Sequence, residues 1–304
     1  MHSADIAATA TQWASWLARL AALCIAFPCS PSFANPPSTV YFLSADATTK
    51  LVGYVFTPVG GGRHPAVVML HGRGGPYSSL SNQRCTFVRE GEASPCGAST
   101  LSQRHVGWGE FWAARGYLAL HVDSFGPRGR GHGFAAHSHD DPNRNDVNER
   151  TVRPLDAQGA LAYLARRDDV LPARIGLQGW SNGASTALNV MSDQAGKQGA
   201  EQYRAALAFY PGCGLSAVPS RRYQSDDPIL VFLASEDEEV SPAACKEKLS
   251  TTRSGSALKV VWYDGATHDF DDPGKKRRSV PANRAATDDA MRQAEAFFAD
   301  RLAR

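Results

Sequence analysis

Short runs of apolar residues recur along the chain. Two of them, TVYFLSA at 39–45 and KLVGYVFTP at 50–58, flank a polar stretch and predict an antiparallel hairpin. The six later runs are continuous, which is typical of strands buried on both faces of a parallel sheet. These runs are PAVVMLHG (65–72), YLALHVD (117–123), RIGLQG (174–179), AALAFYP (205–211), PILVFLA (228–234) and LKVVWYD (258–264).

Amphipathic stretches separate these runs and predict helices. In the clearest of them, residues 157, 160, 161 and 164 are apolar and share one helical face. Helices are predicted over 108–115, 151–167, 185–193, 242–252 and 285–302. The alternation predicts an α/β fold, a mostly parallel sheet with helices on both faces, in one domain over 35–304. Two long irregular segments, 77–106 and 126–150, interrupt it, and such loops usually carry function or are disordered.

The composition indicates a globular protein and excludes an electrostatic footprint for nucleic acid. A chain of 304 residues that is 43% hydrophobic and 20% charged can bury a large core. The 32 basic and 30 acidic residues nearly cancel and are spread along the chain. Charge therefore predicts no nucleic-acid partner.

The N-terminus resembles a secretory signal peptide over residues 1–34. Arg19 precedes an apolar run from Leu20 to Phe27, and small residues at Ser32 and Ala34 predict cleavage after Ala34. The run is too short to span a bilayer, and no later segment approaches the roughly 20 apolar residues that a spanning helix needs. We therefore expect a soluble periplasmic or secreted protein with no membrane partner.

Cleavage would remove two of the six cysteines and leave four in an oxidising compartment. Four cysteines allow three pairings. We favour Cys85 with Cys96, inside one loop, and Cys213 with Cys245, which follow two predicted strands. Buried free thiols are the alternative.

Ser181 lies in a Gly-x-Ser-x-Gly sequence between a predicted strand and a predicted helix. That context is typical of a nucleophile elbow, a turn so tight that Gly179 and Gly183 are needed beside the serine. A short motif of this kind also occurs by chance, so its strand-turn-helix position carries the prediction. Ser181 is the predicted nucleophile.

A serine nucleophile needs a base and an acid that orients the base. His268 follows the last predicted strand and is the only histidine after the predicted acid strand, 228–234. In this kind of site the acid precedes the histidine in the chain. We choose Asp237, although spacing alone does not separate it from Glu236, Glu238 and Glu239; Asp264 is a more distant candidate.

Two backbone N–H groups are expected to hold the oxyanion of the tetrahedral intermediate. The glycines of LHGRGG, which follow a buried strand, let the backbone turn inward, so Arg73 is the first candidate. Asn182, directly after the nucleophile, is the second.

The chain resembles the dienelactone hydrolase family of α/β-hydrolases over most of the predicted mature sequence. HGRGG, DSFGPRGRG, RPLDAQGALAYL, ARIGLQGWSNGAS, ASEDEEVSP and GATHDFD occur in the order of that family's blocks. The resemblance implies an eight-stranded sheet, a small-molecule ester or lactone substrate, and neither a metal nor an organic cofactor. It also supports Asp237 as the acid. The best-known members carry cysteine where this chain has Ser181, so a dienelactone substrate does not follow.

Several residues are candidates for substrate contacts. Arg128 or Arg130 could bind a carboxylate, although turn arginines are more often solvated. The aromatic candidates for an acyl pocket are Tyr77, Trp108, Phe134 and Trp180, with helix packing as the alternative for Trp108.

Other parts of the sequence are compatible with functions other than a serine esterase. A loop with His132, His137, His139, Asp140 and Asp141 resembles a metal-ligand cluster and would favour a metal-dependent hydrolase. A binding module is expected to have lost part of the triad. Acyl transfer, or cleavage of an amide or peptide, would use the same triad. The basic run 275–278 is interpreted as a solvated loop.

Overall fold

A sheet of eight strands forms the centre of the computed structural model, which describes residues 36–302 except 137, 139–140, 198, 200, 215–216, 219–222 and 251–257. The strands coincide with the predicted apolar runs to within a few residues. They are β1 (Ser38–Leu43), β2 (Lys50–Phe56), β3 (His64–Leu70), β4 (Leu118–Asp123), β5 (Val170–Trp180), β6 (Ala206–Phe209), β7 (Ile229–Glu236) and β8 (Leu258–Thr267).

The strand order is β1-β2-β4-β3-β5-β6-β7-β8. β1 and β2 form the predicted antiparallel hairpin, β2 pairs antiparallel with β4, and all later pairs are parallel. The mostly parallel eight-stranded sheet is thus confirmed. Leu70 at the end of β3 pairs with Gly179 near the end of β5, so the loops that follow these two strands emerge side by side.

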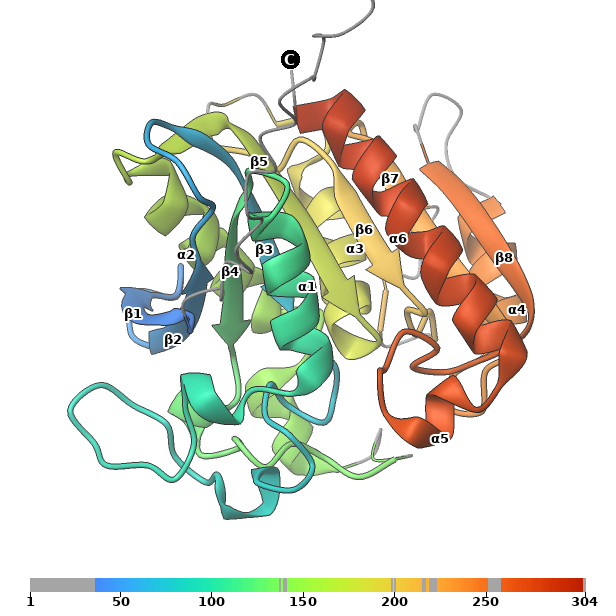
Figure 1. Cartoon of the computed structure of the whole chain (residues 1–304), viewed down its shortest axis with the longest axis horizontal. Coiled ribbons are helices and arrows are strands. Elements are labelled where there is room, and N and C mark those ends of the chain that lie inside the picture. The colour runs from blue at the N-terminus through green and yellow to red at the C-terminus, as the bar shows by residue number, and fades with distance from the viewer. Residues whose placement is uncertain are drawn as a thin grey trace, which may run out of the picture. The chain divides into compact units, whose positions relative to one another are not determined.

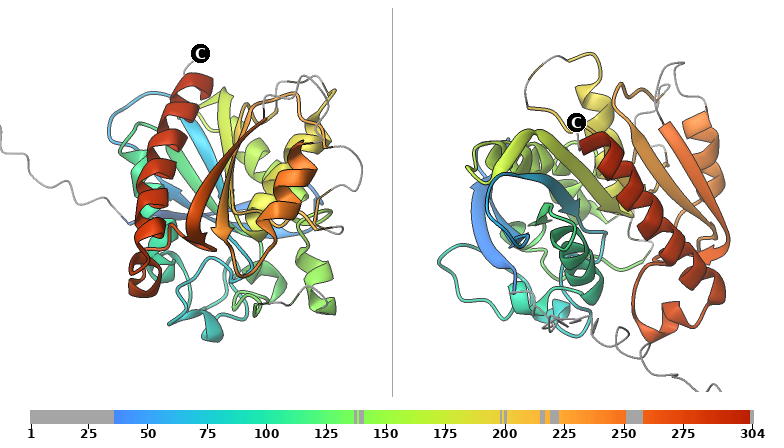
Figure 2. Two further views of the ribbon diagram at one scale, coloured as in Figure 1. Left: turned by 90° about the vertical axis from the view of Figure 1, so that its right-hand side faces the viewer. Right: turned by 45° about the horizontal axis from the view of Figure 1, so that its top comes forward.

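Helices cover both faces of the sheet, as the alternation predicted (Figures 1 and 2). α1 and α6 lie on one face, and α2 and α3 pack behind the sheet in Figure 1. The helices are α1 (Gln103–Ala113), α2 (Arg153–Ala165), α3 (Asn182–Gln194), α4 (Pro242–Ser250), α5 (Lys275–Arg278) and α6 (Pro281–Leu302). The predicted helices α1, α3 and α6 begin three to five residues earlier than expected, and the basic run forms the short helix α5. The Ser102 side chain caps α1 by accepting the N–H of His105.

Alternating side chains of the central strands build two separate cores. Val67 and Met69 of β3 pack in the core beneath α1 and α6, whereas Val68 and Leu70 pack in the core beneath α2 and α3. All four side chains are fully buried, so β3 is covered on both faces. This explains why the sequence of β3 is continuously apolar rather than alternating.

The two long irregular segments gather where the parallel strands end, at the bottom of Figure 1. They contain the short 3-10 turns Asn82–Arg84, Ala98–Thr100, Gly126–Arg128 and Pro142–Val147. Backbone hydrogen bonds join the segments, from Val88 to Gly126 and from Gly131 to Thr86. The described parts of both segments are therefore joined to each other near the candidate site.

The two predicted disulfides are present. Cys85 and Cys96 are bonded within the first long segment, with Cα atoms 5.7 Å apart. Cys213 and Cys245 are 4.9 Å apart between Cα atoms and link the chain after β6 to α4.

Removal of these bonds is expected to destabilise the fold. The Cys85–Cys96 bond closes a loop with a sequence separation of 11, and a loop of this size contributes roughly 3 kcal/mol in the chain-entropy treatment. Denaturant unfolding with and without reductant measures the loss for both bonds together. Thiol titration of the denatured, unreduced protein should find no free thiol at these four positions; four free thiols would contradict the assignment.

The described residues between 36 and 302 belong to one compact unit. Along the described part of the chain, no helix is both long and apolar enough to cross a bilayer. The predicted signal peptide lies outside the described residues and stays a prediction.

Candidate active site

Ser181 occupies the turn between β5 and α3 in an unusual backbone conformation, with φ 51° and ψ −117°. Such a conformation is costly for a residue with a Cβ atom and persists only where the surrounding structure enforces it. A Cβ atom on Gly179 would lie 2.1 Å from the carbonyl oxygen of Gly183, and one on Gly183 would lie 2.1 Å from that of Leu70. Both glycines are therefore required by backbone contacts that hold the serine in place.

Ser181, His268 and Asp237 form a hydrogen-bonded chain. The Oγ of Ser181 lies 3.0 Å from Nε2 of His268, and Nδ1 of His268 lies 2.7 Å from Oδ2 of Asp237. Three different strands supply them: Ser181 follows β5, Asp237 follows β7 and His268 follows β8. The side chains of His268 and Asp237 are each 1% exposed, so their hydrogen bond is shielded from water.

Nearby acids set the pKa of His268. Burial lowers this pKa, but the hydrogen bond to Asp237 and the negative charges of Asp269, Asp237 and Glu239 outweigh burial and raise it above 6.5. A histidine that accepts a proton from serine must start neutral. The active form is therefore reached at a higher pH than an ordinary histidine would give.

We accordingly expect activity to fall with decreasing pH at a midpoint above 6.5, because protonated His268 is no longer a base. Glu239→Gln removes one of the charges that favour the protonated form, so its midpoint should lie at lower pH. The measurement is kcat/KM for a neutral ester across pH 5 to 9, with the exposed Glu236→Gln as control. A midpoint unchanged in Glu239→Gln would rule out this influence of Glu239.

The other acids near the triad have different partners. Glu238 accepts the backbone N–H of His268 at 3.0 Å and pairs with Arg277, whereas Glu236 is exposed. Asp264 is exposed and accepts the indole N–H of Trp262. Glu239 forms a two-point ion pair with Arg73, at 2.6 and 2.8 Å. Of the carboxylates that follow β7, Asp237 is the one that contacts Nδ1 of His268.

Two residues beside Ser181 have backbone N–H groups without an acceptor in the described part of the chain. A Cβ atom on Gly72 would lie 3.4 Å from that of Ser181, so the loop after β3 passes directly against the nucleophile. Among the described residues, the N–H groups of Arg73 and Asn182 have no hydrogen-bond acceptor. Both residues, with Ser181, line one cavity. These free donors are available to a developing oxyanion.

Arg153 connects the two segments that carry these donors, a role that is not evident from the sequence. It is fully buried at the start of α2 and donates to the carbonyl oxygen of His71 at 2.8 Å and to the side chain of Asn182. The Asn182 amide in turn donates to Glu149 at 2.7 Å. In the sequence, only the position of Arg153 within the RPLDAQ block could have indicated this role.

Three of the residues predicted to contact the substrate bind other side chains instead. The indole N–H groups of Trp108 and Trp180 both donate to the buried Asp271 at 2.8 Å. Arg128 forms a two-point pair with Asp156, at 2.8 and 2.9 Å. None of these three side chains lines a described cavity at Ser181, because each is held by a buried carboxylate.

The remaining candidates sit close to the loop after β3. Tyr77 lines a cavity beside Ser181, but it is buried and its hydroxyl donates to Asp123 at 2.7 Å. Phe134 accepts a hydrogen bond from the Arg73 side chain through its carbonyl oxygen, at 2.8 Å. Arg130 donates to Asn143 at 2.6 Å.

Two cavities open onto Ser181. The smaller cavity, about 280 Å³, is lined by Asn182, Gly212, Cys213, Ala217, Val240 and Ala244. The larger cavity, about 430 Å³, is lined by Asn82, Gln103, Arg104, His268, Asp269 and Asp272. Ser181 and the paired Arg73 and Glu239 line both. The nucleophile is thus accessible from two sides.

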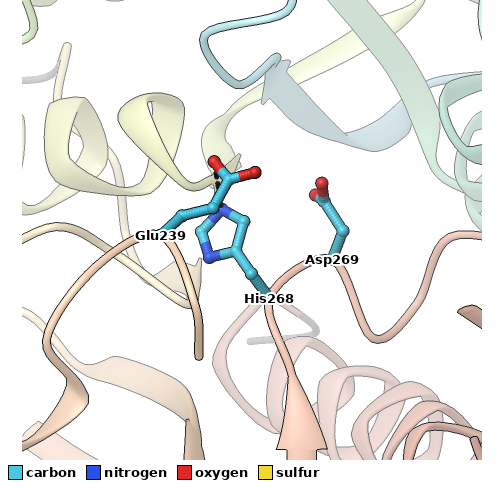
Figure 3. A group of neighbouring side chains, drawn as sticks. All are labelled: Glu239, His268 and Asp269. Atoms are coloured by element: carbon cyan, nitrogen blue, oxygen red, sulfur yellow. Dashed lines mark ion pairs between the residues drawn. The ribbon is translucent and has the colours of Figure 1, made fainter. Parts of the chain in front are cut away.

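Glu239, His268 and Asp269 lie close enough to resemble a metal-ligand group, with one donor atom of each within 4.8 Å of the others (Figure 3). Each already has a partner: Glu239 pairs with Arg73, Asp269 with Arg104, and His268 with Ser181 and Asp237. A cation would have to compete with two arginines. Of the histidine loop, His132 is exposed, and His137, His139 and Asp140 lie outside the described residues.

Solved structures of other proteins share this fold. The fold is similar to a dienelactone hydrolase-like promiscuous phosphotriesterase from metagenomic libraries, at a TM-score of 0.64 and 18% identity, over 87% of this chain and 98% of that chain. It is also similar to esterase 2 of Thermogutta terrifontis, at a TM-score of 0.60 and 18% identity, over 89% and 96% of the two chains. No curated protein matches the chain.

The sequence profile of the dienelactone hydrolase family matches residues 109–302, a stretch that includes Ser181, Asp237 and His268. Since this match covers more than half of the chain, the protein belongs to the dienelactone hydrolase family and is a carboxylic ester hydrolase.

Proposed function

We propose that this hydrolase cleaves small carboxylic esters or lactones through a triad of Ser181, His268 and Asp237. His268 takes the proton of the Ser181 hydroxyl as Oγ attacks the carbonyl carbon, and Asp237 stabilises the resulting imidazolium. The N–H groups of Arg73 and Asn182 hold the oxyanion. As the tetrahedral intermediate collapses, the bond to the leaving oxygen breaks and His268 gives its proton to that oxygen.

Water then completes the cycle. His268 takes a proton from a water molecule that attacks the acyl-enzyme, and the second collapse releases the carboxylic acid and returns the proton to Oγ. The observation that carries the proposal is the hydrogen-bonded chain from Ser181 through His268 to Asp237. The related fold of Thermogutta terrifontis esterase 2, for which a propionate-bound form and a form phosphorylated by paraoxon are known, is consistent with it.

Covalent labelling tests the proposal directly. The mature protein and Ser181→Ala are treated with a fluorophosphonate, measured by intact-protein mass spectrometry and assayed on p-nitrophenyl esters. We expect one adduct and turnover with the wild type, and neither with the variant. A folded wild-type protein that takes up no label and hydrolyses no ester would overturn the proposal.

We further propose that the protein is exported and that cleavage follows Ala34. The two disulfides support this, because such bonds persist in oxidising compartments. N-terminal sequencing of the protein recovered outside the cytoplasm should begin at Asn35. Recovery of the uncleaved chain in the cytoplasm alone would contradict export.

A further inference from the structure

The two cavities at Ser181 differ in chemistry, and this difference points to a class of substrate. We propose that the smaller cavity takes a short acyl group and the larger cavity a neutral, hydroxyl-rich alcohol, so that the substrates are short-chain esters of polyols or sugars. This inference rests on the proposed function of the triad.

The position of His268 decides which part of an ester enters which cavity. His268 must give its proton to the leaving oxygen, so the alcohol has to lie on the side of its imidazole. His268 lines the larger cavity and is absent from the lining of the smaller one. Of the two candidate oxyanion residues, Asn182 lines only the smaller cavity and Arg73 lines both, so the smaller cavity is assigned to the acyl group.

The larger cavity offers hydrogen-bond donors and acceptors together. Asn82 is half-buried and Gln103 is exposed, and among the described residues neither side-chain amide has a hydrogen-bond partner. Asp272 uses one carboxylate oxygen to accept the N–H of Gly274, which leaves the other available. An amide both donates and accepts, as does a hydroxyl group. These groups can form hydrogen bonds with a polyol but not with an alkyl chain.

The charges around the larger cavity disfavour an anionic alcohol. Both of its arginines hold carboxylates, Arg73 through Glu239 and Arg104 through Asp269. Asp272 adds a negative charge, so a carboxylate on the substrate would meet repulsion rather than a free arginine. Tyr77, which lines this cavity, offers no open face to a cation, since it is buried and its hydroxyl is hydrogen-bonded.

The smaller cavity suits a short apolar chain. Its polar side chains are occupied: Glu149 contacts Arg144 and Asn182, and the Ser185 hydroxyl donates to the carbonyl oxygen of Gly212 at 2.7 Å. Small or apolar side chains line much of the rest. Its volume of about 280 Å³ is just below the roughly 300–1,000 Å³ of typical ligand sites. The charged Arg144 and Glu149 also line it, so a longer acyl chain would meet polar groups and should be disfavoured.

Two ester series test the inference on the mature protein. One keeps the acetyl group and varies the alcohol: glycerol 1-acetate, glucose 6-acetate, ethyl acetate, hexyl acetate and acetylcholine. The other keeps p-nitrophenol and varies the acyl group from acetate to octanoate. We expect kcat/KM for the two hydroxylated acetates to exceed that for ethyl acetate by about tenfold, the scale of one or two hydrogen bonds. Octanoate should react at least tenfold more slowly than acetate.

Variants test which cavity residues determine the preference for hydroxylated alcohols and short acyl groups. Asn82→Ala should reduce the ratio of kcat/KM for glycerol 1-acetate to that for ethyl acetate, chiefly through KM, whereas the neighbouring exposed Gln83→Ala should leave the ratio unchanged. Ala244→Trp should disfavour butyrate relative to acetate. Equal rates on all acetates, or a preference for hexyl acetate or acetylcholine, would overturn the inference while the serine esterase stands. No labelling and no turnover would overturn both.

Discussion

Ser181→Ala should lower kcat by about 10⁴ to 10⁶, and His268→Ala by a similar factor. The first variant removes the atom that attacks the ester. The second removes the base that lies 3.0 Å from it, without which a serine hydroxyl is a poor nucleophile at neutral pH. Rates on p-nitrophenyl acetate measure both losses, and thermal unfolding shows whether the fold persists.

The double variant should be hardly slower than either single variant. The two side chains act as one unit, so once one is lost the other has no step left to assist. Activity that remains comes from the N–H groups of Arg73 and Asn182 and from substrate binding. If the two losses in log kcat simply added, Ser181 and His268 would act independently, and the hydrogen bond between them would not be catalytic.

The sequence predicts much of this site because chain order and local backbone geometry are enough to identify it. A serine between two glycines at a strand-helix junction needs a backbone that few folds provide, and the contacts of Gly179 and Gly183 show why. His268 could be chosen because only one histidine follows the predicted acid strand. Neither choice requires knowledge of distant partners.

Prediction is weaker where a side chain's role depends on its partners in space. Trp180 is next to Ser181 in the chain, but its side chain enters the core beneath α1 and α6 and reaches Asp271. Arg128 was a candidate anion site, yet Asp156, which is 28 residues later, occupies it. Arg153 is a buried cation whose acceptors come from two other segments. The spacing of residues along the sequence does not predict these side-chain contacts.

The choice among the acids after β7 also depends on three-dimensional structure. Asp237 accepts the backbone N–H groups of Glu239 and Val240 through Oδ1, both at 2.9 Å, so its other oxygen is directed at His268. Glu236 and Glu238, its neighbours, are exposed. The turn after β7 therefore fixes Asp237 as the group that orients the imidazole.

Asp237→Asn should consequently lower kcat by about 10⁴ while leaving the fold intact. The two backbone N–H groups will retain the amide oxygen of the asparagine, because only an oxygen can accept them. Its NH₂ group then faces Nδ1 of His268, which must accept rather than donate. The ring proton moves to Nε2, opposite Ser181, where a base is required. The imidazole is then held in the wrong tautomer for catalysis.

Matched substitutions separate this effect from a loss of negative charge. Glu236→Gln removes a charge from the preceding residue and should change kcat by less than about twofold, since exposed charges interact weakly. Both variants are compared with the wild type on the same neutral ester above the pH at which His268 loses its proton. If Glu238→Gln instead of Asp237→Asn caused the large loss, Glu238 would be the acid. In that case the 2.7 Å contact of Asp237 with Nδ1 would be structural only.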